Sequence, residues 1–259
     1  MRAYGVDVSH YQLDIDWKKV KESGKRFAIM KAQYEAKYEA KSHKKDEYFE
    51  ANYKGCADNG IMRGVYIFIG TQSIKDPVLD AQSLLKHLNG RVLEYGIWLD
   101  MEAASLRACG KKEITRIANV YANIFERAGY YVGIYSNLDW TKNVLDMKAL
   151  ERFDFWMARY PKNDTGVIKE GLNPGGVAWQ YSSKGIVPGI KKRCDLDVDF
   201  DGIINLGKEK KTNEEIADEV ISGMWGSKNT SPTRKELLTS AGYNYFEVQQ
   251  IVNEKLLNK

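Results

Sequence analysis

The alternation of apolar and amphipathic segments is the feature that most limits how this chain can fold. Four nearly continuous apolar runs predict strands that are covered on both faces. They lie at residues 3–9, 27–33, 63–70 and 96–102. Apolar residues recur at helical spacing at 16–24, 45–60, 78–88 and 112–129. This order predicts parallel strands joined by crossover helices.

The pattern changes in the last third of this region. Four more strand-like segments lie at 130–136, 153–160, 176–183 and 194–200, but Pro and Gly are frequent between the later ones and helical spacing is lost. The link from Ser183 to Cys194 is barely long enough for a parallel crossover. We therefore predict an irregular α/β barrel of the (β/α) type with eight strands and about five helices. An open doubly wound sheet is the alternative.

Composition excludes several classes of protein. The chain has 259 residues, 43% of them hydrophobic, which is enough for a full-sized core. Its net charge of +4 is too small to indicate nucleic-acid binding. No signal-peptide pattern and no apolar run of bilayer length is present, so we expect synthesis in the cytoplasm and no membrane insertion.

The motifs of common cofactors and metals are absent from the sequence. It contains no Gly-rich phosphate loop and no G-x-S-x-G pattern, and its three histidines are too scattered for a zinc site. The three cysteines are widely spaced, which favours reduced, structural thiols. We therefore expect neither a cofactor nor a metal.

Two carboxyl groups end the fourth strand. Residues 96–105 read GIWLDMEAAS, so Met101 separates Asp100 from Glu102. Residues two apart in a strand share a face, and reactive groups of such barrels gather at the carboxyl ends of the strands. Both acids should therefore enter the barrel mouth, where crowding raises at least one pKa, as glycosidic cleavage requires. A helix cap or a surface loop is the alternative interpretation.

Further acids and aromatic residues fall at corresponding strand ends. Asp7 ends the first strand, and the last strand carries Asp195 and Asp197 at alternate positions. A calcium loop over 195–201 is the alternative, but the apolar residues between the acids favour a strand. The candidate sugar-binding residues, for which a place in the core is the alternative, are Tyr66, Tyr135, Trp156, Trp179 and Gln180.

Several segments together carry a family resemblance. They are YGVDVSHYQ, GVYIFI, DAQ, WLDME, GIYSN, WMARYP, WQYSS and CDLDVDFDG. In order and spacing they closely resemble glycoside hydrolase family 25, the phage and bacterial lysozymes. The resemblance implies an irregular β/α barrel that hydrolyses, with net retention, the β-1,4 bond between N-acetylmuramic acid and N-acetylglucosamine in peptidoglycan. By position it implies Glu102 as general acid/base, Asp100 as its partner, and Asp7 and Asp195 as supporting acids.

Two mechanisms fit this acid pair. Asp100 could be a covalent nucleophile, or it could orient the substrate's own acetamido group for attack on the anomeric carbon. We favour the second, because acids two apart on one strand are rather close for roles on opposite faces of a sugar.

The C-terminal segment has the pattern of a separate unit. We predict a catalytic barrel over 1–206, a charged linker over 207–211 and a three-helix domain over 212–259, which begins with a capping box of Thr212 and Glu215. The last segment resembles the three-helix cell-wall-binding repeat of some phage lysozymes. Candidate wall contacts are Trp225, Gly226, Arg234, Tyr243 and Tyr245, with closure of a small core by these rings as the alternative.

Three functional hypotheses follow. The first is a phage endolysin, a muramidase with a wall anchor that binds bacterial peptidoglycan and reaches it through a partner pore. The second is a wall-binding protein that no longer cuts, and the third is a metal-dependent amide hydrolase. A single weak repeat would gain from multivalency, so self-association is also left open.

Overall fold

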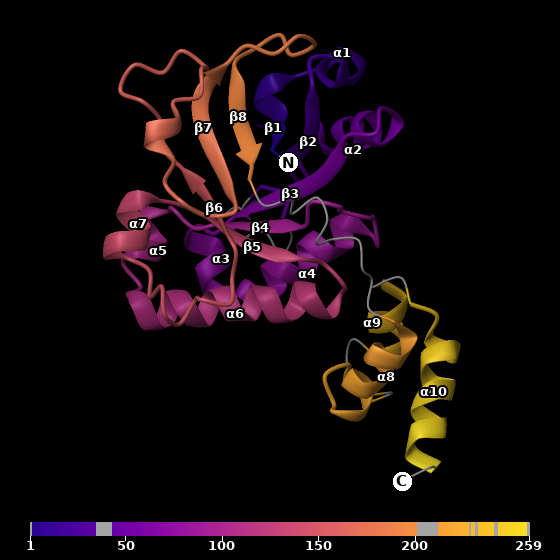
Figure 1. The fold of residues 1–259 in the computed structure, drawn as a ribbon. Coiled ribbons are helices and arrows are strands. Elements are labelled where there is room, and N and C mark those ends of the chain that lie inside the picture. The colour runs from indigo at the N-terminus through magenta and orange to yellow at the C-terminus, as the bar shows by residue number, and fades with distance from the viewer. Residues whose placement is uncertain are drawn as a thin grey trace.

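The structure contains a closed barrel of eight strands. The computed structural model describes residues 2–34, 43–200, 212–227, 229–230, 233–240 and 243–257. The strands are β1 (Ala3–Val8), β2 (Lys25–Lys31), β3 (Met62–Phe68), β4 (Ile97–Asp100), β5 (Val132–Asn137), β6 (Phe155–Ala158), β7 (Ala178–Gly185) and β8 (Cys194–Asp199). They follow one another around the barrel in chain order, and β8 closes it against β1 (Figure 1). The predicted barrel is confirmed, and the open doubly wound sheet is excluded.

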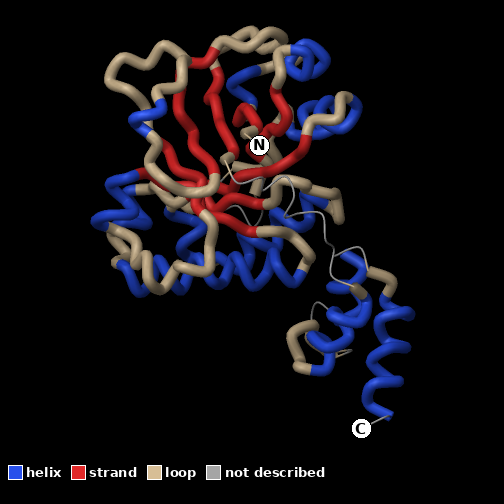
Figure 2. Tube along the Cα trace, in the orientation of Figure 1, coloured by secondary structure: helices blue, strands red, loops and turns tan. Residues whose placement is uncertain are grey.

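Strand direction changes at the last strand. Neighbouring strands from β1 to β7 are parallel, whereas β8 runs antiparallel to both β7 and β1. A short antiparallel connection therefore replaces a crossover helix between Gly185 and Cys194, as the short link in the sequence indicated. Loops predominate around β6, β7 and β8 in Figure 2.

Seven α-helices accompany the barrel within the described residues, where about five were predicted. They are α1 (Trp17–Glu22), α2 (Phe49–Asp58), α3 (Thr71–Lys75), α4 (Pro77–Leu88), α5 (Ala104–Arg107), α6 (Lys111–Arg127) and α7 (Leu138–Asn143). Short 3₁₀ helices lie at His10–Gln12 and Glu170–Leu172. The prediction missed the shortest α-helices, because four or five residues are too few to show helical periodicity.

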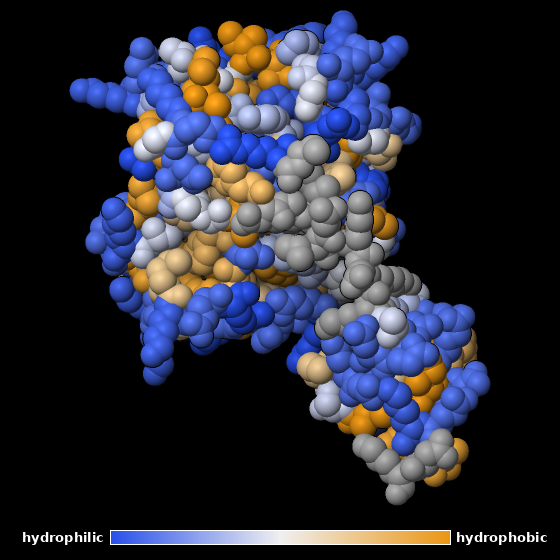
Figure 3. Space-filling view, in the orientation of Figure 1, coloured by the Kyte–Doolittle hydropathy of each residue, from blue (hydrophilic) through white to orange (hydrophobic). Residues whose placement is uncertain are grey.

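The helices bury one face against the barrel. α4 and α6 pack together, and α6 lies against β4 and β5 (Figure 1). The outward face of α6 is hydrophilic, as Figure 3 shows along the lower edge of the barrel. Within the described ranges, none of the helices combines the length and the apolar character needed to span a bilayer.

Side chains alternate between two apolar layers along each strand. Ile97 and Leu99 belong to the layer between barrel and helices, whereas Trp98 points into the barrel. The interior layer consists of Ala3, Phe27, Ile29, Tyr95, Trp98, Tyr135, Trp156, Ala158 and Ala178. Gly133 permits this packing, because a Cβ atom there would lie 2.2 Å from the Trp98 ring. The alternation decides which residues reach the barrel mouth.

Three C-terminal helices have a small core of their own. They are α8 (Asn213–Ile221), α9 (Arg234–Ser240) and α10 (Tyr245–Leu257). The predicted capping box is present: Thr212 Oγ1 accepts from the backbone N–H of Glu215, and Glu215 accepts from the backbone N–H of Thr212. The core consists of Ile216, Ala217, Val220, Trp225, Leu238, Tyr243, Val248 and Val252. The proposed linker at 207–211 lies outside the described residues.

Candidate active site

A groove of about 150 Å³ opens at the end of the barrel where the parallel strands have their carboxyl ends and β8 begins. It is lined by Asp7, Tyr66, Asp100, Glu102, Tyr135, Trp156, Gln180 and Asp195. These residues come from β1, β3, β5, β6, β7 and β8, and from the end of β4 and the loop after it. The structure therefore brings together every catalytic candidate and all but one of the predicted sugar-binding residues.

Asp100 and Glu102 lie at different depths in this groove. Asp100, the last residue of β4, is 8% exposed, and its Oδ1 has no hydrogen-bond partner among the described residues. Glu102 is exposed at the mouth. Between them, Met101 is fully buried in the outer layer as predicted, and its carbonyl accepts from Ser136 Oγ at 3.0 Å. The buried methionine fixes both acids on the groove side.

Burial and mutual repulsion raise the pKa values of this pair. Burial is the main reason that the pKa of Asp100 lies well above its usual range, and the charge of Glu102 adds to it. The ammonium of Lys31 acts in the opposite direction. Partial burial also raises the pKa of Glu102. One carboxyl group of the pair therefore keeps a proton more readily than a free side chain does, which suits a proton donor.

Gln180 connects Asp7 to the tyrosines of the groove. Its Nε2 donates to Asp7 Oδ2 at 2.7 Å, and its Oε1 accepts from Tyr135 Oη at 2.8 Å and from Tyr160 Oη. Because Nε2 points to Asp7, the amide oxygen Oε1 points to the two tyrosine hydroxyl groups and accepts from both. This network holds the Asp7 carboxyl group in one orientation.

Asp195 faces Asp7 across the strand pair that closes the barrel. The two residues are direct partners in the antiparallel register of β1 and β8. Burial, together with the charge of Asp195, holds the pKa of Asp7 well above its usual range. Burial raises the pKa of Asp195 to about 6, against the effect of its hydrogen bond with Asp7. Asp7 thus retains its proton and donates it in a hydrogen bond to Asp195. The pair therefore carries less than two full negative charges.

Trp179 is the predicted sugar-binding residue that lies outside the groove. It is fully buried in the outer layer, where its ring packs against Tyr181 and Phe200, and its Nε1 donates to the Arg159 carbonyl at 2.8 Å. Its strand neighbour Gln180 lines the groove. Adjacent strand residues point to opposite faces, so a prediction that places both in the groove conflicts with strand geometry.

Two residues near the groove were missed by sequence reasoning. Lys31 ends β2, with its Nζ 6.0 Å from the centroid of the Tyr66 ring, and it is the cation that acts on Asp100. Tyr160 donates to Gln180. A lone lysine at the end of an apolar strand is a signal of the same kind as Asp7 and could have identified Lys31. Tyr160 lies two residues beyond the end of β6, and within the predicted strand at 153–160 it shares a face with Trp156 and Ala158, so strand alternation could have identified it.

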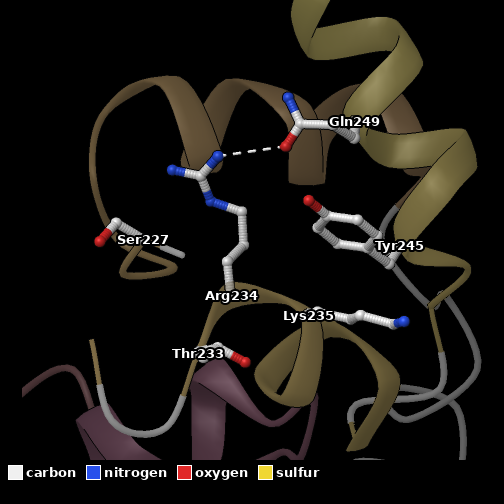
Figure 4. A pocket seen from close by; sticks show the side chains of 6 residues that line it. All are labelled: Ser227, Thr233, Arg234, Lys235, Tyr245 and Gln249. Carbon is white, nitrogen blue, oxygen red and sulfur yellow. Dashed lines mark hydrogen bonds between the residues drawn. The ribbon is translucent and has the colours of Figure 1, made fainter. Parts of the chain in front are cut away.

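A second pocket, of about 520 Å³, lies in the C-terminal unit. Ser227, Thr233, Arg234, Lys235, Tyr245 and Gln249 line it (Figure 4). Arg234 Nη1 donates to Gln249 Oε1 at 3.2 Å, and two further guanidinium N–H groups donate to the Gly226 carbonyl. This pocket contains two cations and no carboxylate among its lining residues, so it is suited to a polar or anionic ligand.

The five predicted wall contacts divide between the pocket and the core. Arg234 and Tyr245 line the pocket, and Gly226 supports Arg234 through its carbonyl group. Trp225 and Tyr243 are buried, with their rings 6.1 Å apart in edge contact. Trp225 Nε1 also donates to Glu219 at 2.8 Å. These two rings therefore close the small core, as the alternative interpretation held.

Comparison with known sequences identifies the family of the barrel. The sequence profile described as "Glycosyl hydrolases family 25" matches residues 6–190. The chain belongs to this family. A second profile, described as "CW_7 repeat", matches residues 214–256 within the C-terminal unit of the family 25 chain. The family assignment and the repeat agree with the two resemblances recognised in the sequence.

Relatives of this family 25 chain include bacterial and phage lysozymes. The chain is 26% identical over 200 residues to the autolytic lysozyme of Clostridium acetobutylicum, covering 77% of this chain and 56% of that one. It is 33% identical over 139 residues to the lysozyme of Streptococcus phage Cp-7, covering 52% and 39%. The chain thus spans less than two thirds of the length of these curated relatives.

A solved endolysin has the same fold over nearly the whole length. The CTP1L endolysin matches with a TM-score of 0.65 at 20% identity, and the match covers 99% of this chain and 100% of that one. At this identity the likeness establishes the fold alone.

Proposed function

We propose that the family 25 chain is a muramidase that hydrolyses, with net retention, the β-1,4 bond between N-acetylmuramic acid and N-acetylglucosamine in bacterial peptidoglycan. The observation that carries this proposal is the convergence of four carboxyl groups and three aromatic rings on one groove. Lysozymes among the relatives support the substrate class.

Glu102 is the proposed general acid/base. Of the pair at the end of β4 it is the exposed one, so its carboxyl group can reach the oxygen of a glycosidic bond lying across the mouth. Its raised pKa favours the protonated form needed to donate to the leaving oxygen. After the bond breaks, the same group as carboxylate takes a proton from the incoming water.

Asp100 is the proposed partner in the first step. We favour substrate assistance, in which the acetamido oxygen attacks the anomeric carbon as the glycosidic bond breaks and Glu102 protonates the leaving oxygen. The buried Asp100 would accept the acetamido N–H, and its Oδ1 is free of hydrogen-bond partners among the described residues. Water then opens the ring so formed, and two inversions give net retention. A covalent bond from Asp100 is the alternative.

Asp7 and Asp195 are proposed to support the groove rather than to transfer the proton. Their shared proton reduces the negative charge close to the reacting acids, and Gln180 fixes the position of Asp7. The half-buried Tyr66 is the ring that can contact a sugar most directly, whereas the buried Tyr135 and Trp156 shape the groove wall together with Gln180.

The C-terminal unit is proposed as a wall-binding domain over 212–259, after the barrel over 1–206. The match to a repeat profile and the pocket around Arg234 and Tyr245 support this role. Peptidoglycan carries amide and carboxylate groups, which the guanidinium group and the neighbouring hydroxyls can bind. The two parts would then act together, because binding by the repeat raises the concentration of wall at the groove.

A comparison of cutting with binding tests the enzymatic proposal. Wild type and Glu102→Gln are mixed with purified cell walls, and both the release of reducing sugars and the protein bound to the pellet are measured. We expect the variant to bind normally and to release sugars at least about a hundredfold more slowly. Wall binding by wild type without release of sugars would support the non-catalytic alternative.

A chelator tests the metal-dependent alternative. Within the described residues, no group of three or more His, Cys, Asp or Glu side chains is arranged to hold a metal ion. We expect full activity in excess chelator. Loss of activity that added metal restores would contradict the proposal.

Substitution at Arg234 tests the wall-binding pocket. Arg234→Met should lower the fraction of protein bound to walls while leaving hydrolysis of small soluble fragments unchanged. Arg116→Met is the matched control, because Arg116 is an exposed arginine of α6 that pairs with Glu113. Equal binding by Arg234→Met and the control would overturn the pocket assignment.

Two further expectations stay predictions. Release to the wall through a partner pore is tested by adding the protein from outside to intact and to permeabilised cells. Self-association is tested by measuring mass in solution at two concentrations.

A further inference from the structure

A third carboxyl group of the last strand lies beneath the groove. Asp197 follows Asp195 by two residues on β8, so it points into the barrel one step deeper. It lies opposite Gly5 on β1 and Gln180 on β7 and has no exposed surface. Asp197 does not line the groove, yet it stands directly behind residues that do.

Asp197 is tied to one wall of the groove. Its Oδ1 accepts a hydrogen bond from Trp156 Nε1 at 2.9 Å, and the carboxyl group of Asp7 lies close enough to act on it. The Trp156 ring lines the groove and lies 4.4 Å from the Tyr135 ring. The ring also meets Trp98 edge-on at 5.9 Å, so the bond to Asp197 is the polar contact among those that hold the indole in place.

The surroundings of Asp197 favour its neutral form. The charged groups that act on it are Asp7 from β1, Asp195 from its own strand and Lys25 from β2. The other titratable groups that it influences are Tyr95, Tyr160, Tyr181 and Cys194. Burial, with the charge of Asp195, raises the pKa of Asp197 to about 8, although Trp156 and Lys25 oppose this rise.

We propose that Asp197 is a positioning residue that holds Trp156 in the groove wall and does so as an uncharged carboxylic acid. As a neutral group it accepts the indole N–H without adding a further negative charge beside the Asp7–Asp195 pair. The catalytic part of this inference rests on the proposed muramidase activity, whereas its structural part does not.

Two substitutions of similar size separate the hydrogen bond that Asp197 accepts from the charge that it could carry. Asp197→Asn is neutral and keeps an acceptor oxygen, and Asp197→Leu is neutral without one. We expect kcat/KM on peptidoglycan to stay within about threefold for the asparagine variant and to fall about tenfold for the leucine variant. Equal losses in both variants would mean that a charged carboxylate is required, and no loss in either would mean that Asp197 is not a positioning residue.

A double-mutant cycle tests whether Asp197 acts through Trp156. Trp156→Phe removes the indole N–H that Asp197 accepts. In that background, Asp197→Leu should lower kcat/KM by less than about twofold. Asp199→Leu is the matched control, because Asp199 is also fully buried on β8 but lies opposite Ala3 and Ala178. Asp199→Leu should change kcat/KM by the same factor in wild type and in Trp156→Phe. Full additivity of Asp197→Leu and Trp156→Phe would overturn the proposal.

Unfolding at different pH tests the neutral state without any assay of activity. A carboxyl group with a raised pKa stabilises the fold at low pH, and this stability is lost as pH rises toward that pKa. The ratio of folded to unfolded wild type should therefore fall relative to Asp197→Asn by up to about tenfold per pH unit between about pH 5 and 8. Parallel curves would show that Asp197 is ionised and overturn the proposal. If wild type releases no sugars, the proposed function fails, and this measurement still decides the state of Asp197.

Discussion

Gln180→Met removes the centre of the hydrogen-bond network in the groove with little change in side-chain size. The amide of Gln180 donates to Asp7 and accepts from Tyr135 and Tyr160. Tyr160 is 40% exposed, so water can replace its partner, but Asp7 and Tyr135 are buried. A buried polar group that loses its partner costs about 1–3 kcal/mol, so the two together should cost about 2–6 kcal/mol of unfolding free energy.

Urea unfolding measures this cost directly. We expect Gln180→Met to unfold at a lower urea concentration than wild type. The slope of the unfolding free energy against urea should stay unchanged, since the same surface is exposed on unfolding. The matched control is Gln82→Met on the exposed face of α4, which should change the free energy by less than about 0.5 kcal/mol. Sugar release should also fall, because the Gln180 donor lowers the pKa of Asp7 and fixes its orientation. A cost below about 1 kcal/mol would refute the reasoning.

Two further predictions concern pH and the outer layer of the core. Because the pKa of Asp195 is raised to about 6, its contribution to stability is present below about pH 4 and is lost as pH rises to about 6. Between pH 4 and pH 7 the free energy of unfolding should fall more in wild type than in Asp195→Asn, by up to about 3 kcal/mol. An equal fall in both proteins would contradict this. Trp179→Ala should cost about 3–5 kcal/mol of stability but leave KM of the folded enzyme unchanged, whereas a raised KM would mean that Trp179 contacts substrate.

The barrel was predictable because burial on both faces makes its strands apolar. All eight strands lie within or close to the predicted ranges. The short link from Ser183 to Cys194 indicated an irregular last third, but the antiparallel direction of β8 was not predicted. The shortest helices were not predictable, since α3 and α5 have one turn each and depend on tertiary packing.

Strand alternation predicted the groove more reliably than residue type did. Asp100 and Glu102 share the groove face while Met101 packs in the core, as spacing required. Trp179 was chosen because it is aromatic, and its position next to Gln180 already placed it on the other face. The role that we propose for Asp197 depends on depth within the barrel, which a sequence does not reveal.

The C-terminal unit shows the limit of reasoning from residue type in small domains. Trp225 and Tyr243 are the aromatic residues buried in its core, and a three-helix unit has few other groups with which to fill one. Arg234, by contrast, cannot be buried without partners, and it lies at the pocket with its N–H groups bound to Gly226 and Gln249.

The most direct test of the account is mass spectrometry of the fragments that wild type and Glu102→Gln release from purified peptidoglycan. The account predicts fragments with reducing-end N-acetylmuramic acid from wild type and none from the variant. Fragments with reducing-end N-acetylglucosamine would mean that the groove cuts the other glycosidic bond. Free peptides, or equal release by the variant, would contradict the assignment of Glu102 as the acid of a muramidase.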